Sequence, residues 1–231
     1  MRLRFDAVSV PRIGGVADDG EDACGFDEGA GLAVVCDGAG SQFASREWAR
    51  CLVRRFIAEP EPLLYGDPAA WVTAAGADWR AGLDLHAAGD RVRRAANGGS
   101  GATIAAVRAT TSPGGHLLDV SAVGDTCVYV VRDGRPHFAH PIAVSGEFPA
   151  RPPLVTTWDT DPPARASLEL RTGDTVILAT DATARWAATR PAGDWEKLVR
   201  LTIAHLADLL TRRRDRGEIA DDDLTLLRGF A

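Results

Sequence analysis

Nine segments of strand length dominate this sequence, and few helices separate them. Each segment is an apolar or alternating run of a length typical of β-strands. The expected strands cover residues 2–9, 31–36, 102–110, 116–123, 126–132, 135–139, 167–170, 175–179 and 224–228. A parallel, doubly wound sheet needs a helix between successive strands, and the pattern lacks that alternation. The sequence therefore predicts an α+β fold in which helices pack outside antiparallel sheets.

Three stretches carry the periodicity of helices. Residues 42–58 form one continuous apolar stripe. Residues 69–96 repeat the same spacing but contain three glycines, which predict a break in the helix. A third helix is expected to start at Asp194, as its N-cap, and to run to at least Leu210.

No linker or internal repeat divides the chain, so we expect residues 1–231 to form a single domain. Residues 141–163 are rich in proline and polar residues and are expected to form a loop. Metal-ligand spacing is absent around the four cysteines, which are Cys24, Cys36, Cys51 and Cys127. We therefore expect reduced, mainly buried thiols and no zinc site.

The charge pattern argues against two classes of partner. The chain carries 26 Lys and Arg against 32 Asp and Glu, a net charge of −6, and residues 212–214 are its one basic cluster. Because phosphate neutralisation supplies most of the affinity for nucleic acids, such a chain is a poor nucleic-acid binder. No run approaches the ~18 apolar residues of a membrane span, and the first residues lack the apolar stretch of a signal peptide. We expect a cytoplasmic protein with neither nucleic acid nor membrane as a partner.

Acidic residues stand where the apolar, strand-like runs begin or end. They are Glu21, Asp22, Asp37, Asp181 and Asp222. A carboxylate at the end of a buried strand costs free energy unless something pairs with it, and no Lys or Arg flanks Asp37 or Asp222. Unrelated turn and cap aspartates explain any one of these acids. Their recurrence favours a hard divalent cation held by oxygen ligands.

The same segments resemble, in order, the motifs of the metal-dependent protein phosphatases of the 2C (PPM) type. The matching segments are GEDA (20–23), AVVCDGAG (33–40), AVGDTCVY (122–129), RDG (132–134), GDTVILATD (173–181) and DDLT (222–225). The similarity spans residues 7–229, nearly the whole chain. A bacterial subgroup of the family is more similar still, in SVPRIG (9–14), in WAR (48–50) and in the Asp-Ala pair at 181–182.

The resemblance implies two antiparallel sheets packed as a sandwich between helices. It also implies a serine/threonine protein phosphatase, in which two Mn²⁺ or Mg²⁺ ions activate the water that hydrolyses a phosphoprotein monoester. The implied partners are a phosphoserine or phosphothreonine protein and a cognate Ser/Thr kinase. Asp37 is the implied bridge between the ions, and the other implied metal positions are Gly38 through its carbonyl, Asp181, Asp222, Glu21 and Asp22. Glu21 and Asp22 would bind an ion or hydrogen-bond its waters.

Three departures from the family pattern bear on the site. Ala17 stands where members usually have an arginine that grips the phosphate, so Arg12 is the expected substitute, with a solvated loop arginine as the alternative. Asp125 is present, but Arg185 stands where many members have the second acid of a third metal site. A third ion is therefore in doubt, and a contact from Arg185 to Asp125 or to the phosphate is an alternative. Asp223 replaces the usual asparagine.

Two other functions fit the sequence. A catalytically weak or inactive relative would use the same cleft to bind phosphoproteins or a regulator, as the losses at Ala17 and Arg185 suggest. An unrelated β-sandwich would use its acids only for structure. Titration with Mn²⁺ separates the phosphatase from the inactive relative, because an intact site binds at least one ion. The unrelated sandwich would show no change in melting temperature with metal.

Overall fold

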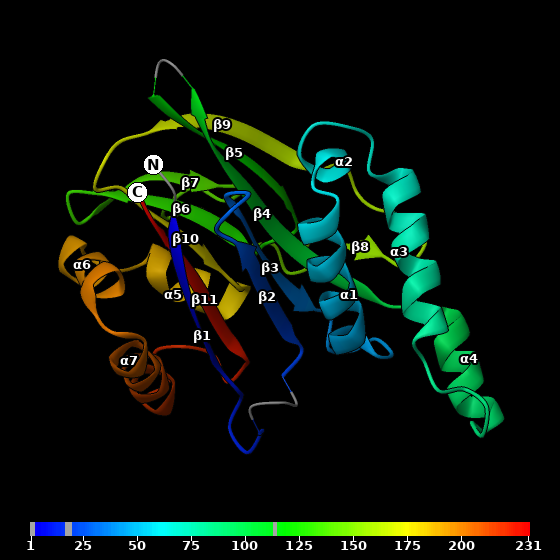
Figure 1. Cartoon of the computed structure of the whole chain (residues 1–231). Coiled ribbons are helices and arrows are strands. Elements are labelled where there is room, and N and C mark those ends of the chain that lie inside the picture. Colours follow the sequence, from blue (N-terminus) through cyan, green and yellow to red (C-terminus); the bar gives the residue numbers. More distant parts are fainter. Residues whose placement is uncertain (1–2, 17–19, 113–114) are drawn as a thin grey trace.

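Two antiparallel β-sheets pack face to face, and helices cover the outer face of each sheet (Figure 1). This is the computed structural model of the chain, and it describes residues 3–16, 20–112 and 115–231. The α+β sandwich expected from the sequence is confirmed. None of the described helices is long and apolar enough to cross a membrane.

The two sheets draw their strands from all parts of the chain. In spatial order the first sheet contains β1 (Arg4–Val10), β11 (Leu224–Phe230), β10 (Thr175–Ala179), β6 (Cys127–Arg132) and β7 (Arg135–His140). The second contains β2 (Asp22–Asp27), β3 (Leu32–Gly38), β4 (Gly101–Ser112), β5 (Gly115–Val123) and β9 (Ala164–Leu170), and β8 (Val155–Thr156) pairs with β4. Every described pairing is antiparallel.

The helices form one layer on each side of the sandwich (Figure 1). Beside the second sheet lie α1 (Ser45–Ala58), α2 (Glu61–Leu64), α3 (Ala69–Ala81) and α4 (Asp90–Gly98). Beside the first sheet lie α5 (Asp181–Ala188), α6 (Ala192–Arg200) and α7 (Ile203–Asp215).

Strand β3 explains why the sequence shows continuous apolar runs instead of alternation. Its Val34 and Cys36 pack under α1 and α3, whereas Ala33 and Val35 pack between the two sheets. A strand that is covered on both faces needs apolar side chains at every position. β3 is therefore buried on both faces, and Asp37 lies near the end of this buried strand.

The expected strands are all present, with ends within three residues of those expected. Residue 2 of the first expected strand lies outside the described residues. The loop expected over 141–163 contains the two-residue strand β8. The cysteines are free, and all but Cys24 are buried. The predicted break within 69–96 is also confirmed, because α3 and α4 are separate helices.

The prediction of a single helix that starts at Asp194 is wrong, because the structure has two helices there, α6 and α7. Leu201 and Thr202 adopt extended backbone and separate α6 from α7, and the Thr202 hydroxyl caps α7 by accepting a hydrogen bond from the His205 N–H. Asp194 is not an N-cap; it lies in the first turn of α6 and pairs with Lys197 at 2.6 Å. The sequence analysis also missed α2 and α5, since four and eight residues are too few to show a helical period.

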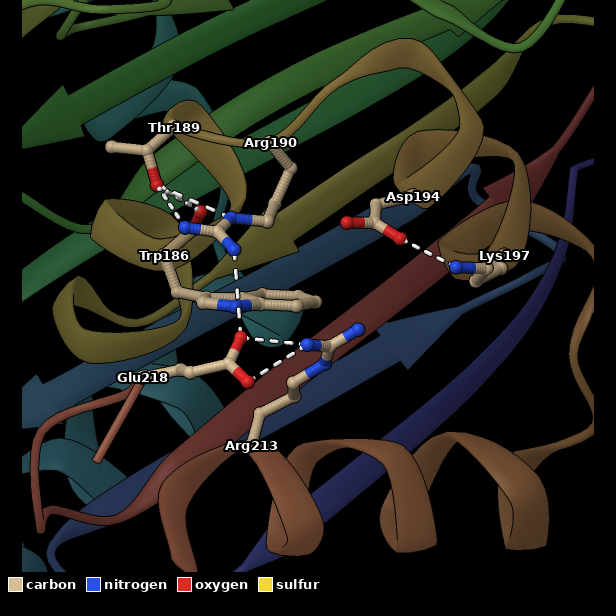
Figure 2. A network of polar contacts seen from close by, with 7 residues as sticks. All are labelled: Trp186, Thr189, Arg190, Asp194, Lys197, Arg213 and Glu218. Carbon is tan, nitrogen blue, oxygen red and sulfur yellow. Dashed lines mark hydrogen bonds and ion pairs between the residues drawn. The ribbon is translucent and has the colours of Figure 1, made fainter. Parts of the chain in front are cut away.

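A polar network joins the ends of α5 and α7 (Figure 2). The Glu218 carboxylate accepts two hydrogen bonds from Arg213, at 2.8 and 2.7 Å, and lies 3.5 Å from Arg190. The Arg190 guanidinium in turn lies over the Trp186 ring, 5.7 Å from its centroid. These contacts fix the end of α5, the helix that begins at Asp181, against the end of α7.

Arg228 anchors the same helix layer to β11, the strand beside the edge strand β1. Its side chain is only 2% exposed. Two of its nitrogens donate to the two carboxylate oxygens of Asp6 on β1, at 2.7 and 2.6 Å. The third donates to the carbonyls that end α6, those of Leu198, Val199 and Leu201. A cation suits this position, because the last carbonyls of a helix carry partial negative charge.

We expect Arg228→Met to lower the free energy of unfolding by about 3 kcal/mol, because it leaves a carboxylate and three carbonyls without their donor. Urea denaturation measures the loss. The matched control is Arg200→Met, which removes an exposed ion pair with Glu196 and should cost less than about 1 kcal/mol. Equal losses in the two variants would contradict the anchoring role.

Candidate active site

The strand pairings bring the acids of the sequence motifs to one end of the sandwich. In the second sheet, Asp22 at the start of β2 lies directly opposite Asp37 near the end of β3. In the first sheet, β10 and β11 are neighbours, so Asp181, just after β10, and Asp222, just before β11, lie at the same end.

Hydrogen bonds join these strand ends across the two sheets. The Thr180 hydroxyl, one residue before Asp181, donates to Asp22 at 2.9 Å. The Glu21 N–H, one residue before Asp22, donates to Asp223 at 2.7 Å. Each bond links a residue of one sheet to an acid-bearing strand end of the other. The carboxylates therefore share one region of the molecule.

The electrostatics of Asp37 show how close the acids are. Burial raises the pKa of the Asp37 carboxyl well above its usual range, and the negative charges of Asp22, Asp181, Asp222 and Asp125 raise it further. All four therefore act on the same buried carboxyl. The cluster carries negative charge that the surrounding protein does not fully compensate.

Asp22 accepts a hydrogen bond from the Thr180 hydroxyl. Burial raises its pKa well above the usual range, hydrogen bonds from Thr225 and Thr180 oppose the rise, and the charges of Asp223 and Asp222 add to it. Because hydroxyl donors stabilise the carboxylate form, both threonines favour the ionised state of Asp22, and the bond from Thr180 also orients it.

Gly38 and Glu21 lie where the chain turns from β3 toward α1. A Cβ atom on Gly38 would lie 2.8–2.9 Å from backbone atoms of Ser45 and Glu21, so only glycine fits. The Gly38 N–H donates to the Glu21 carbonyl at 3.2 Å, and the Ser45 hydroxyl donates to the Glu21 carboxylate at 3.1 Å. The side chain of Glu21 therefore lies against the start of α1.

Asp223 has a role that the sequence analysis did not find. One of its oxygens accepts a hydrogen bond from the backbone N–H of Arg12 at 2.9 Å, and the other accepts one from the backbone N–H of Glu21 at 2.7 Å. An asparagine offers only one acceptor oxygen, so it would leave one of these N–H groups facing an amide NH₂. The sequence-level signal was the replacement of the usual asparagine at this position.

Two arginines border the cavities beside Asp22. A cavity of about 230 Å³ is lined by Asp22, Asp223 and Arg50, among others. A neighbouring cavity of about 220 Å³ shares Asp223 with it and is lined by Arg12, whose side chain is exposed. Ala17 lies outside the described residues. Arg50, which the sequence analysis placed only in a subgroup motif, is therefore a second guanidinium near Asp22.

Arg185 contacts the cluster directly, as one of the sequence alternatives proposed. Its guanidinium lies 3.1 Å from Asp125 and 3.3 Å from Asp181. Burial and then the charge of Asp181 raise the pKa of Asp125 to about 6, although the Arg185 contact opposes the rise. The ion pairs described for this cluster all come from this one arginine.

The chemistry of the donors fits a hard divalent cation. The cluster offers carboxylate oxygens, which are the ligands that Mg²⁺ and Mn²⁺ prefer. Among the described residues, no three His, Cys, Asp or Glu side chains are arranged to hold an ion as they stand. An ion would therefore draw the carboxylates inward, and its positive charge would offset the repulsion that, together with burial, raises the pKa of Asp37.

Comparison with known proteins identifies the family. The family model described as Protein phosphatase 2C matches residues 13–221, so this chain belongs to the protein phosphatase 2C family. The resemblance drawn from the motifs is thereby confirmed. No curated protein sequence matches significantly.

Solved structures share the fold. PppA, a key regulatory component of T6SS in Pseudomonas aeruginosa, has a TM-score of 0.68 and 18% identity, over 100% of this chain and 98% of that chain. The catalytic domain of serine threonine protein phosphatase PstP, in complex with two manganese ions, has a TM-score of 0.64 and 23% identity, over 99% and 98%. Stp1 from Staphylococcus aureus has a TM-score of 0.64 and 17% identity, over 100% and 96%.

We expect Asp37→Asn to stabilise the metal-free protein at pH 8. Because the folded-state pKa of Asp37 is raised, its charge destabilises the fold above that pKa, and the penalty is lost as the pH falls toward the unfolded value of about 3.9. The melting temperature of Asp37→Asn should exceed that of the wild type by a few degrees at pH 8, and the difference should shrink toward pH 4.

Calorimetry in chelator over this pH range measures the difference. The control is Asp208→Asn, which removes the same charge from an exposed position on α7 and should show no pH-dependent difference. A lower melting temperature for Asp37→Asn at pH 8 would contradict the repulsive cluster.

Proposed function

We propose that residues 1–231 form one Mn²⁺- or Mg²⁺-dependent serine/threonine protein phosphatase domain. One structural observation carries the proposal: hydrogen bonds from Thr180 to Asp22 and from Glu21 to Asp223 tie together the strand ends that bear the acids. Membership of the protein phosphatase 2C family supports it, as does the shared fold with PstP, whose structure is in complex with two manganese ions.

The chain's own residues would hold two ions through oxygen atoms. Asp37 would contribute to both ions, Asp181 and Asp222 would hold one of them, and the carbonyl of Gly38 would contribute to the other. When bound, such ions acidify a water molecule and neutralise the charge that develops on the phosphoryl oxygens.

Asp22 and Glu21 have a different proposed task. The Thr180 hydroxyl donates to Asp22 at 2.9 Å, so the Asp22 carboxylate is suited to orient the attacking water. Glu21, whose N–H is bound by Asp223, is suited to bind an ion or to hydrogen-bond its waters. Water would attack the phosphorus while the P–O bond to the serine or threonine oxygen breaks, and the products would be inorganic phosphate and the protonated hydroxyl. No covalent enzyme intermediate is therefore required.

The proposed substrate is a phosphoserine or phosphothreonine protein, and a Ser/Thr kinase would be the opposing enzyme. Arg12 is the proposed phosphate-binding residue, because it is exposed beside the cavity that Asp223 lines. Two divalent ions are proposed, without a third at Asp125. The cytoplasmic location expected from the sequence stays a prediction.

We expect the purified protein to hydrolyse p-nitrophenyl phosphate and a phosphothreonine peptide only when Mn²⁺ or Mg²⁺ is added. Asp37→Asn and Asp181→Asn should each lower kcat by about 100-fold or more, as expected when a group that stabilises transition-state charge is lost. Asp208→Asn serves as the control and should retain full activity.

Two outcomes would contradict this proposal. Turnover that survives chelation of the metal would rule out the metal-dependent mechanism. A folded protein that binds Mn²⁺ only weakly and turns over no phosphopeptide would favour the alternative, an inactive relative that binds phosphoproteins.

We expect Arg12→Ala to raise KM for the phosphopeptide about ten-fold with little change in kcat, because a guanidinium that grips the ground-state phosphate contributes mainly to binding. Steady-state kinetics measures both constants. Arg4→Ala, an exposed arginine at the other end of the first strand, is the control. An unchanged KM would show that Arg12 is a solvated loop residue, and Arg50 would then be the next candidate for binding the phosphate.

A further inference from the structure

Arg185 bridges two carboxylates that belong to different strand ends. It lies one helical turn after Asp181 on α5, so both side chains point from the same face of the helix. Its Nε lies 3.3 Å from an Asp181 oxygen, while Nη2 donates to Asp125 at 3.1 Å. Because different nitrogens serve the two acids, one guanidinium holds both at once.

The position of Asp125 makes this contact important. The side chain of Asp125 is only 4% exposed, whereas that of Arg185 is 43% exposed. A buried carboxylate without a partner is costly, and the ion pair described for Asp125 is the one with Arg185. The guanidinium thus supplies a positive charge at a point where a metal ion would otherwise be favourable.

The same guanidinium contacts the segment between β7 and β8. Its Cζ atom lies 4.9 Å from the centroid of the Phe148 ring, which is a cation–π contact. Phe148, with Ile142 and Val144, packs against the apolar cluster beneath α5. Arg185 is therefore shared between the acidic cluster and the 141–154 segment.

We propose that Arg185 is a positioning residue whose guanidinium is the fixed cation of the Asp125 side of the cluster. It excludes a metal ion from Asp125, and through Phe148 it holds the 141–154 segment against the site. The first part rests on the proposed function, since it concerns the ions; the second part does not.

Proteolysis of the metal-free protein tests the second part. Glu147 is exposed and is the one acidic residue within 141–154, so a glutamate-specific protease reports on this segment by cleaving after it. Arg185→Ala should speed cleavage at Glu147 about three-fold or more, because the loss of the cation–π contact populates the open segment. Arg185→Lys should restore part of the protection, since it keeps the charge.

Two matched variants complete this experiment. Phe148→Leu should speed cleavage to the same extent as Arg185→Ala, whereas Arg200→Ala, at an exposed ion pair on α6, should leave the rate unchanged. Equal rates in the wild type and Arg185→Ala would overturn the proposed tether.

Calorimetric titration with Mn²⁺ tests the first part. Arg185→Glu replaces the fixed cation by a carboxylate beside Asp125 and should bind one more ion per chain than the wild type. Phe148→Leu should bind the same number as the wild type. An equal number of ions for the wild type and Arg185→Glu would overturn the exclusion of metal from Asp125. A wild type that binds no Mn²⁺ would instead overturn the proposed function, and proteolysis would still decide the tether.

Discussion

Hydrogen bonds between the two sheets hold the acidic strand ends together, and the candidate site depends on them. The Thr180–Asp22 bond joins β10 to β2 at 2.9 Å, and the Thr103–Thr126 hydroxyl pair joins β4 to the segment before β6 at 2.5 Å. These contacts work against the mutual repulsion of the carboxylates. Burial first, and then this repulsion, raise the pKa of Asp37. The apolar interior of the sandwich supplies the stability that allows such a cluster to persist.

Two arginines show how burial decides what a cation does here. Arg228 is almost fully buried, and its five-donor guanidinium is used on one carboxylate and three carbonyls, so its role is to fix the helix layer. Arg185 is much more exposed and meets two carboxylates and an aromatic ring at the border of the site. Solvent screens the contacts of a partly exposed guanidinium, so they contribute less to stability than buried contacts do. The first arginine therefore acts on stability and the second on the arrangement of the site.

Much of the fold could be predicted because burial leaves a strong pattern. Strands such as β3 and β10, covered on both faces, read as continuous apolar runs, and the glycines between 69 and 96 marked the break before α4. The C-terminal helices were harder. A single apolar stripe continues from α6 into α7, while the extended backbone at Leu201 separates them. That backbone conformation leaves no trace in hydrophobic periodicity.

The sequence by itself determined the strand pattern, the membership of the acids in ordered motifs and the oxygen-donor chemistry that suits divalent cations. These properties are local, since each depends on neighbouring residues along the chain. Only the tertiary structure decided that Asp223 clamps two backbone N–H groups and that Arg185 bridges Asp125 and Asp181. Both arrangements join residues from separate elements, and the partner of a side chain is set by how strands and helices pack in space.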